Sequence, residues 1–422
     1  MNCNCVALNK DGYDTSCPYG NVKGSSVQKH ITLIKENSSL DYSHPLCYNY
    51  QKNRKEGYIM QNAKLLRYLT AVFMVFINLW NFVVNDYAYP AVSRDGAYLM
   101  VYFVGNSPEE QTIHLAVSTD GYNFAALNNN KPIIEQTKGT GCVRDPYIFK
   151  AKDEKGNDCF YIVATDMDAM QGWTSNHAII FWKSYDLINW TDETVVDIRD
   201  FKGWEDCNRA WAPQVIYDET AGKYMVYLAL STWDDPKTPL NEDCAQHYYM
   251  YTEDFKTFTA PEYLYGRRSE VVTREDGSTY TGVQCIDGDM VYNKKDGYYY
   301  LYFKEDLTQE TAYVRAKTPA GFADVKDDYV VATDNWHGVE GSYMYNITGT
   351  NKWIMFMDEY SNGTFAAWMT SDFKNFKRFR RALYSVDHLN PRHGSVVAIS
   401  DVEYLRAVAY YGVSEIPENP NK

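Results

Sequence analysis

Motifs that mark several common enzyme classes are absent from this sequence of 422 residues. It contains no Gly-rich phosphate loop, no Gly-x-Ser-x-Gly nucleophile motif and no His-Glu-x-x-His metal pair. These absences argue against a P-loop nucleotide hydrolase, an α/β-hydrolase and a zinc protease of that type. The formal net charge of −14 also argues against a nucleic-acid partner, because phosphate backbones bind basic surfaces.

Paired cysteines are also missing, although the chain has nine cysteines. No Cys-x-x-Cys pair with a matching partner occurs, so we expect no structural zinc site. Four cysteines lie before residue 50 and the others are scattered singly. We therefore interpret them as isolated thiols and assign no disulfide. The scattered ones are Cys142, Cys159, Cys207, Cys244 and Cys285.

The first ninety residues form two segments that differ in composition. Residues 1–59 are polar, and we predict that they are a non-domain segment upstream of the true start at Met60. Residues 60–90 combine a basic start, the apolar run TAVFMVFINLW and a small residue near the end, which is the plan of a secretory signal peptide. A buried helix or a membrane anchor is the alternative, but Asn78 and Asn81 disfavour stable membrane insertion. We therefore expect a secreted or periplasmic protein.

From residue 97 onward, short runs rich in Tyr, Val and Ile end at Asp, Gly or Asn turns, as β-strands do. The 38 tyrosines suit β-structure and surfaces that stack on sugar rings. A motif with a hydroxyl residue, an Asp and a later aromatic follows several runs, with a degenerate copy at 316–322. Its Asp should accept hydrogen bonds from nearby backbone amides, so we interpret these residues as structural. They are Asp120, Asp186, Asp254 and Asp372.

A second series of motifs opens the repeated units. Five units of four-strand size predict an all-β fold, a five-bladed β-propeller that covers residues 91–422. Residues 393–400 should supply the inner strand and residues 97–124 the outer strands of the last blade, so that N- and C-terminal strands close the ring. The opening motifs are Arg144–Phe149, Trp211–Tyr217, Ile286–Tyr292, Val339–Tyr345 and Arg392–Val397.

The first strand of each blade lines the channel of a propeller, so these motifs should meet at one pocket. It would hold three carboxylates, those of Asp145, Asp287 and Glu340. Two carboxylates that flank a glycosidic bond can hydrolyse it, one as proton donor and the other by activating water or attacking directly. A third holds the acid protonated by like-charge repulsion. Singly, Asp145 could instead end a turn, Glu340 could pair with a lysine, and His393 could be a core residue.

The succession RDPYIF, WAPQ, IDGD, VEGS and RHGS resembles glycoside hydrolase family 43 over residues 97–412. The resemblance implies a five-bladed propeller that inverts configuration and acts mainly on α-L-arabinofuranosides and β-D-xylosides. It implies that Asp145 is the general base, that Asp287 raises the pKa of the acid and positions it, and that Glu340 is this general acid. His393 matches a channel histidine that often lies near a bound calcium ion or water. No other cofactor is implied.

Three positions depart from the family pattern. Gly288 stands where Pro is common, and Gly341 is followed by Ser342 where Gly-Pro is commoner. We interpret both as backbone variation. Gln214 stands where an Asp or Glu usually follows Trp-Ala-Pro, which removes a charge near the pocket. This third departure bears on the substrate class rather than on catalysis.

The expected partner is a carbohydrate, bound by Arg144, Trp211, Gln214, Arg392 and His393. Arg144 either bonds a sugar hydroxyl or pairs with a neighbouring carboxylate. Trp211 either forms a sugar platform or lies buried under the channel. We expect cleavage of terminal α-L-arabinofuranosyl or β-D-xylosyl residues from plant-type polysaccharides or oligosaccharides. A galactosidase, a retaining fructosidase-like enzyme and a sugar-binding propeller without activity are the alternatives. The oligomeric state is not predicted.

Overall fold

The computed structural model describes residues 87–88, 96–232, 244–273, 277–326, 329–333 and 336–421. The segment 1–59 and most of the signal-peptide-like segment 60–90 lie outside these residues, so what we expect of them stays a prediction. Among the residues described, no helix combines the length and apolar character needed to cross a membrane.

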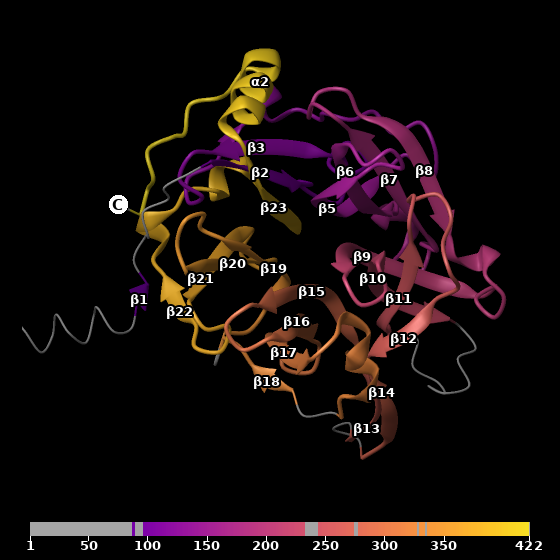
Figure 1. The fold of residues 1–422 in the computed structure, drawn as a ribbon. Coiled ribbons are helices and arrows are strands. Elements are labelled where there is room, and N and C mark those ends of the chain that lie inside the picture. The colour runs from indigo at the N-terminus through magenta and orange to yellow at the C-terminus, as the bar shows by residue number, and fades with distance from the viewer. Residues whose placement is uncertain are drawn as a thin grey trace, which may run out of the picture. The chain divides into compact units, whose positions relative to one another are not determined.

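Antiparallel sheets of four strands make up most of the described chain (Figure 1). Three of them follow chain order, and the predicted all-β class is therefore confirmed. They are β5 (Val143–Lys152), β6 (Asp158–Asp166), β7 (Ala178–Ser184) and β8 (Thr191–Asp197); β9 (Cys207–Asp218), β10 (Lys223–Thr232), β11 (Gln246–Thr252) and β12 (Glu262–Tyr265); and β15 (Cys285–Asn293), β16 (Tyr298–Glu305), β17 (Glu310–Ala316) and β18 (Val330–Val331).

Two further sheets combine distant parts of the chain. A short strand near residue 87 adds in parallel to the edge of one sheet, and the last strand of the chain pairs with an early strand in the other. A separate two-stranded hairpin follows β12 and precedes β15 in the sequence. The strands are β19 (Glu340–Asn346), β20 (Trp353–Glu359), β21 (Thr364–Thr370), β22 (Lys377–Phe379) and β1 (Tyr87–Ala88); β23 (Gly394–Ile399), β2 (Ala97–Tyr102), β3 (His114–Ser118) and β4 (Ala125–Ala126); and the hairpin β13 (Arg267–Thr273) and β14 (Thr279–Val283).

Each large sheet contacts the next through its first strand. Strand β5 contacts β9, β9 contacts β15, β15 contacts β19, β19 contacts β23, and β23 contacts β5. These five strands therefore face one another around a common centre, which Figure 1 shows between the sheets. The starts of these strands are therefore close together in space, although the strands are far apart in the sequence.

The core lies between neighbouring sheets rather than inside any single sheet. One cluster joins Phe149 and Val163 of the β5–β8 sheet to Val226 and Leu228 of the β9–β12 sheet. Because both faces of the second strands are covered, these strands read as nearly continuous apolar runs. Tyrosines such as Tyr300 also belong to these core clusters, and several are fully buried.

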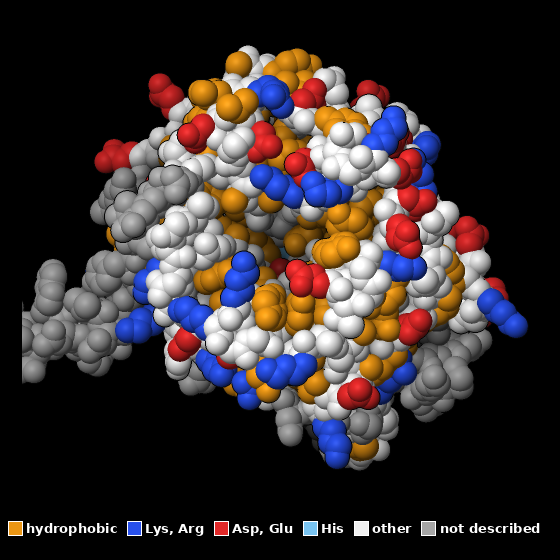
Figure 2. Space-filling model, in the orientation of Figure 1, with side chains coloured by type: hydrophobic (Ala, Val, Ile, Leu, Met, Phe, Trp, Pro, Cys, Tyr) orange, Lys and Arg blue, Asp and Glu red, His pale blue; other side chains and the backbone are white. Residues whose placement is uncertain are grey.

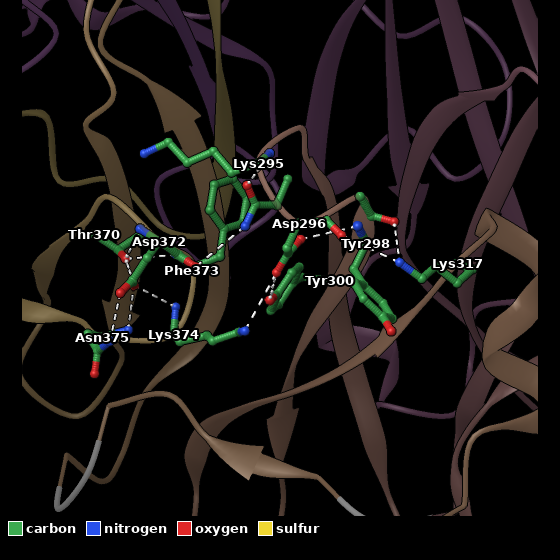
Figure 3. A network of polar contacts seen from close by, with 12 residues as sticks. Lys295, Asp296, Tyr298, Tyr300, Lys317, Thr370, Asp372, Phe373, Lys374 and Asn375 are labelled. Carbon is green, nitrogen blue, oxygen red and sulfur yellow. Dashed lines mark hydrogen bonds and ion pairs between the residues drawn. The ribbon is translucent and has the colours of Figure 1, made fainter.

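The four recurrent Asp residues are structural, as predicted. The Asp372 carboxylate accepts hydrogen bonds from the backbone amides of Lys374 and Asn375 at 3.0 and 2.8 Å (Figure 3). Phe373 between them has a φ of +67°, a left-handed conformation that the turn imposes. Equivalent pairs of amide hydrogen bonds reach the other three carboxylates, Asp120, Asp186 and Asp254.

These turns also connect neighbouring sheets. Lys374 in the Asp372 turn lies 3.6 Å from the carboxylate of Asp296, which belongs to the β15–β16 turn (Figure 3). The Tyr300 hydroxyl donates to the same carboxylate at 2.6 Å, and the Lys295 ammonium donates to the Ser371 carbonyl at 2.9 Å. The Asp residue thus shapes a turn, and the flanking residues attach that turn to the next sheet.

One α-helix was not anticipated from the strand-rich pattern. Helix α2 (Asp401–Tyr411) follows β23 and packs Ala407 against the core. Ser400 and Glu403 form a capping box, which satisfies backbone amides that a helix start leaves without partners. The other helical turns among the described residues are short 3₁₀ segments: η2 (Asn128–Asn130), η3 (Ala169–Gln171), η4 (Ile198–Asp200), η5 (Pro319–Asp324), η6 (Arg381–Leu383) and η7 (Asp387–Leu389).

Candidate active site

Four of the five first strands carry the same irregularity near their start. In β5, β9, β15 and β19 the pairing with the second strand shifts so that two residues oppose one, which defines a β-bulge. The first bulged residue has a positive φ in each case. These residues are Asp145 (φ +49°), Ala212 (φ +48°), Asp287 (φ +56°) and Gly341 (φ +57°).

The bulges direct certain side chains toward the centre. In a regular strand the same side chains would point elsewhere. A bulge bends the strand and reorients the residue within it, and such features gather near active sites. Asp145 and Asp287 occupy the bulge position, whereas Glu340 stands one residue before the bulge of its own strand. Gly341 has no room for a side chain, because a Cβ atom there would lie 2.5 Å from the His393 ring. The bulge position in β19 is therefore occupied by a glycine, and the carboxylate of this strand comes from the preceding residue, Glu340.

A single pocket joins the three predicted carboxylates. Figure 2 shows a hollow on this face, where the starts of the first strands meet. The pocket encloses about 460 Å³ of space, part of it open to solvent. Its lining confirms that the opening motifs converge at one place, although the lining alone assigns no role. The residues that line it are Phe103, Arg144, Asp145, Met167, Trp173, Trp211, Ile286, Asp287, Glu340 and His393.

Asp145 lies partly buried between a cation and a hydroxyl. One carboxylate oxygen lies 3.3 Å from Nδ1 of His393, and the other accepts a hydrogen bond from Thr165 at 2.9 Å. Burial alone would raise the pKa of Asp145. The hydrogen bond and charge of His393, the charge of Arg144 and the Thr165 hydroxyl outweigh burial and lower this pKa. The Asp145 carboxyl is therefore held in its ionised form.

Asp287 experiences the opposite environment. Its carboxylate accepts a hydrogen bond from the backbone amide of Gly341 at 2.9 Å. Burial, together with the charges of Glu340 and Asp145, raises the pKa of Asp287 to about 6, although His393 opposes this rise. Two carboxyls of one pocket thus differ in protonation behaviour because only one of them has a direct cationic partner.

Asp289, two residues further along β15, lies behind the pocket. Its carboxylate accepts a hydrogen bond from the Met344 amide at 2.9 Å and is not part of the pocket lining. Burial raises the pKa of Asp289 to about 7. This second carboxyl therefore ties β15 to β19, and the choice of Asp287 for the pocket agrees with the structure.

Glu340 sits between two cations. Its two carboxylate oxygens lie 3.1 Å from the Lys304 ammonium and 3.3 Å from the Arg392 guanidinium. Arg392 also contacts Asp358 through Nε at 2.5 Å. Burial, with the charge of Glu340, raises the pKa of Asp358 to about 6 despite Arg392. Pairing with a lysine is the alternative role that the sequence allowed for Glu340. That ion pair is present, and Lys304 belongs to the same network of charged residues as the pocket.

His393 is buried at the centre of the carboxylates. Burial would lower its pKa, but the Asp145 hydrogen bond and the charges of Asp287 and Glu340 raise it to about 9. A protonated imidazole offers no lone pair to a metal, and calcium prefers oxygen ligands. In the described part of the chain, no group of three or more His, Cys, Asp or Glu side chains is placed to hold a metal ion. The calcium ion that the family resemblance implies near His393 therefore stays a prediction, and no step below uses a metal.

The residues expected to bind substrate are placed differently from one another. Arg144 and Trp211 line the pocket, and Trp211 meets the exposed Trp173 edge to face at 6.3 Å. Arg392 approaches the pocket from behind Glu340. Gln214 does not line the pocket, because it follows the bulge of β9 and accepts a hydrogen bond from the Tyr227 hydroxyl at 2.8 Å. Its expected contact with the sugar receives no support.

Sequence reasoning missed the residues that come from second strands. Thr165, Lys304 and Asp358 lie directly opposite Arg144, Ile286 and Glu340 in the three ladders. They therefore occupy the same place in three of the five large sheets. Thr165 lies 21 residues after its partner and the other two lie 18 residues after theirs, so a search at one fixed offset in each repeat would not have found all three.

Comparisons with known proteins found a matching family model and similar solved structures. The family model described as a probable glycosyl hydrolase domain, related to glycoside hydrolase family 43, matches residues 95–405. No match was found among curated proteins. Among solved structures, an exo-β-1,3-galactanase from Clostridium thermocellum is 14% identical with a TM-score of 0.41. The match covers 57% of this chain and 49% of that one, so this chain spans about half the length of the galactanase.

Two further structures with other reported activities are similar to about the same degree. An exo-1,5-α-L-arabinanase from a bovine ruminal metagenomic library is 18% identical, with 69% of this chain and 96% of that chain covered and a TM-score of 0.43. A β-xylosidase is 15% identical, with 64% and 86% covered and a TM-score of 0.41. The family match spans more than half of the sequence, and the protein belongs to the glycosyl hydrolases related to glycoside hydrolase family 43.

Proposed function

We propose that this protein is an inverting, exo-acting glycosidase on a five-bladed β-propeller. The cyclic contacts of β5, β9, β15, β19 and β23 support five blades, and the pairing of β23 with β2 supports a ring closed by early and late strands. One observation carries the function. Asp145, Asp287 and Glu340 line a single pocket, yet their partners and burial differ, as acid–base hydrolysis requires.

In this proposal Asp145 is the general base. Its lowered pKa keeps the carboxylate ready to accept a proton from a water molecule that attacks the anomeric carbon. His393 and Thr165 fix the orientation of the carboxylate from either side. The substrate lies between this water and the acid, which is why inverting enzymes separate their two carboxyls by roughly 6.5–9.5 Å.

Glu340 is the general acid and donates its proton to the leaving oxygen. Lys304 and Arg392 then stabilise the carboxylate that forms as the proton departs. Asp287 interacts electrostatically with both reacting carboxyls and accepts a hydrogen bond from the Gly341 amide on the strand of Glu340. It therefore positions the acid and adjusts the charge of the pocket as it titrates.

The decisive variant is Glu340→Gln. Turnover of glycosides with poor leaving groups should fall by about 10²- to 10⁴-fold, whereas nitrophenyl glycosides, which need less protonation, should lose much less. Glu359→Gln is a matched control, since Glu359 is a buried, ion-paired carboxylate on β20 that does not line the pocket. Near-wild-type turnover of poor leaving groups by Glu340→Gln would refute the assignment.

The sugar is proposed as a terminal α-L-arabinofuranosyl or β-D-xylosyl group, as the sequence motifs imply. A galactosyl group is the second candidate. A screen against nitrophenyl arabinofuranoside, xyloside and galactoside separates these possibilities. NMR of the first product then shows whether the anomeric configuration is inverted, and retention would point to a nucleophilic mechanism instead.

A further inference from the structure

Arg144 is a cation in the pocket without an acidic partner at contact distance. Its side chain lies at the pocket wall and is only 6% exposed. One guanidinium nitrogen, Nη1, donates to the side-chain oxygen of Asn106 at 2.8 Å, and lies 3.5 Å from both the Gly105 carbonyl and the Gln111 side-chain oxygen. All three partners are neutral. No carboxylate of the described residues lies within 4 Å of this guanidinium.

The two other long cationic side chains of the site are paired. Arg392 contacts Asp358 and Glu340, and Lys304 contacts Glu340 and Asp306. A buried cation is costly unless an anion or several hydrogen bonds compensate for lost hydration. Arg144 has the neutral bonds of Nη1, whereas Nη2 and Nε form no hydrogen bond with any residue that the structure describes.

Aromatic rings fix the plane of the Arg144 guanidinium. Its centre lies 4.5 Å from the Phe103 ring and 5.3 Å from the Trp173 ring. Stacking of this kind holds the planar group in place without using its donors. A held guanidinium with two free donors matches a carboxylate, which accepts two parallel N–H bonds. A sugar hydroxyl would use only one of these donor nitrogens and would bring no charge, and the acidic groups nearest to Arg144, Asp145 and Glu340, act on it without a direct contact.

From this geometry we propose that the sugar entering the pocket carries a carboxylate, as a uronosyl group does, and that Arg144 binds it. This inference rests on the proposed glycosidase function, and it replaces the neutral terminal sugar proposed above with its acidic counterpart as the substrate class. A β-D-glucuronosyl group is a β-D-xylosyl group with a carboxylate on C5, so the proposal keeps the ring type and adds one charge. Arg144 thereby becomes the residue that determines specificity.

The charge of the whole site is compatible with an anionic sugar. Four groups carry or can carry positive charge, and the four opposing carboxyls include two, Asp287 and Asp358, whose pKa is raised to about 6 by burial. In mildly acidic solution the cations therefore outnumber the ionised carboxylates. The cations are Arg144, Lys304, Arg392 and His393, and the carboxyls are Asp145, Asp287, Glu340 and Asp358.

Matched pairs of substrates test the inference. The pairs are nitrophenyl β-D-glucuronide with β-D-xyloside, and nitrophenyl β-D-galacturonide with β-D-galactoside. We expect the acidic member of at least one pair to have the higher kcat/KM. Arg144→Gln should lower the acidic-to-neutral ratio of that pair by about 10- to 100-fold, the usual range for a charged hydrogen bond. Arg315→Gln, an exposed arginine on β17, is the matched control and should leave the ratio unchanged.

Binding separates failure of this inference from failure of the proposed function. Calorimetry on Glu340→Gln protein compares D-glucuronate with D-xylose, and D-galacturonate with D-galactose. Tighter binding of a uronate that depends on Arg144 supports the inference even if no glycoside is cleaved. Hydrolysis of a neutral glycoside with no uronate preference overturns the inference and leaves the glycosidase intact. A uronate preference that survives Arg144→Gln, or no tighter binding of uronates, overturns it as well.

Discussion

Replacing Asp289 with Asn should stabilise the protein at high pH without disabling the pocket. The carboxyl of Asp289 is buried and keeps its proton up to a pKa of about 7, whereas an exposed Asp loses its proton near pH 4. Between these values the unfolded chain binds fewer protons than the folded protein, so the free energy of unfolding falls as pH rises. An Asn at this position has no such pH dependence, and its side-chain oxygen can still accept the Met344 amide.

The size of the effect follows from the shift. A difference of about three pKa units corresponds to roughly 4 kcal/mol, which is an upper value because water penetration and relaxation reduce it. The Asn variant should match the wild type near pH 4 and gain stability through pH 7. Urea unfolding followed by tryptophan fluorescence between pH 4.5 and 8.5 measures the difference.

A carboxyl of opposite character supplies the control. Burial would raise the pKa of Asp372, but hydrogen bonds from Asn375 and the Lys374 amide lower it. Its contribution to stability is present above pH 4 and is lost as pH falls through the lowered pKa. Asp372→Asn should therefore be destabilised at neutral pH. A pH-independent difference for Asp289→Asn, or one that follows Asp372→Asn in sign, would refute the reasoning.

Three other predictions concern the pocket. Asp287→Asn should lower kcat by about 10²-fold or more, whereas Asp289→Asn should stay within a few-fold, and similar losses in steady-state assays would remove the distinction between them. Trp173→Ala should raise KM more than it lowers kcat, because we expect this exposed ring at the pocket wall to bind the sugar without reaching the reacting atoms; equal effects on both would contradict this role. His393 has a pKa raised to about 9, so its contribution to stability is complete below pH 6.5 and is lost as pH rises toward 9; thermal melts of His393→Gln should lack this step.

Local signals in the sequence were sufficient for the turns and the strand starts. The hydroxyl-x-Asp pattern needs only its own backbone amides, so its structural role at Asp120, Asp186, Asp254 and Asp372 could be predicted from sequence. The positions of Asp145, Asp287 and Glu340 at strand starts could be predicted from the repeat. Helix α2 was missed although Ser400 and Glu403 are a visible capping box, because the strand-rich pattern dominated the interpretation.

The bulges could not be predicted in the same way. Asp145 and Ala212 each precede a proline, and such residues normally adopt extended conformations rather than a positive φ. Only the neighbouring strands hold them there, through bonds such as that from the Ala212 amide to Thr165. The partners of Glu340 were hidden for a related reason. Lys304 and Asp358 end apolar strands, and their place depends on strand register, which the sequence of one strand does not reveal.

The placement of His393 has a consequence for the order in which the pocket is completed during synthesis. The pocket draws on the chain from Phe103 to His393, and the strand that carries the histidine into place pairs with β2. A ribosome translates Asp145, Asp287 and Glu340 long before His393 emerges. Until then Asp145 lacks the imidazole that holds it ionised, and β2 lacks its partner. A nascent or truncated chain that ends before residue 393 therefore carries all three carboxylates but lacks the imidazole that lowers the pKa of Asp145.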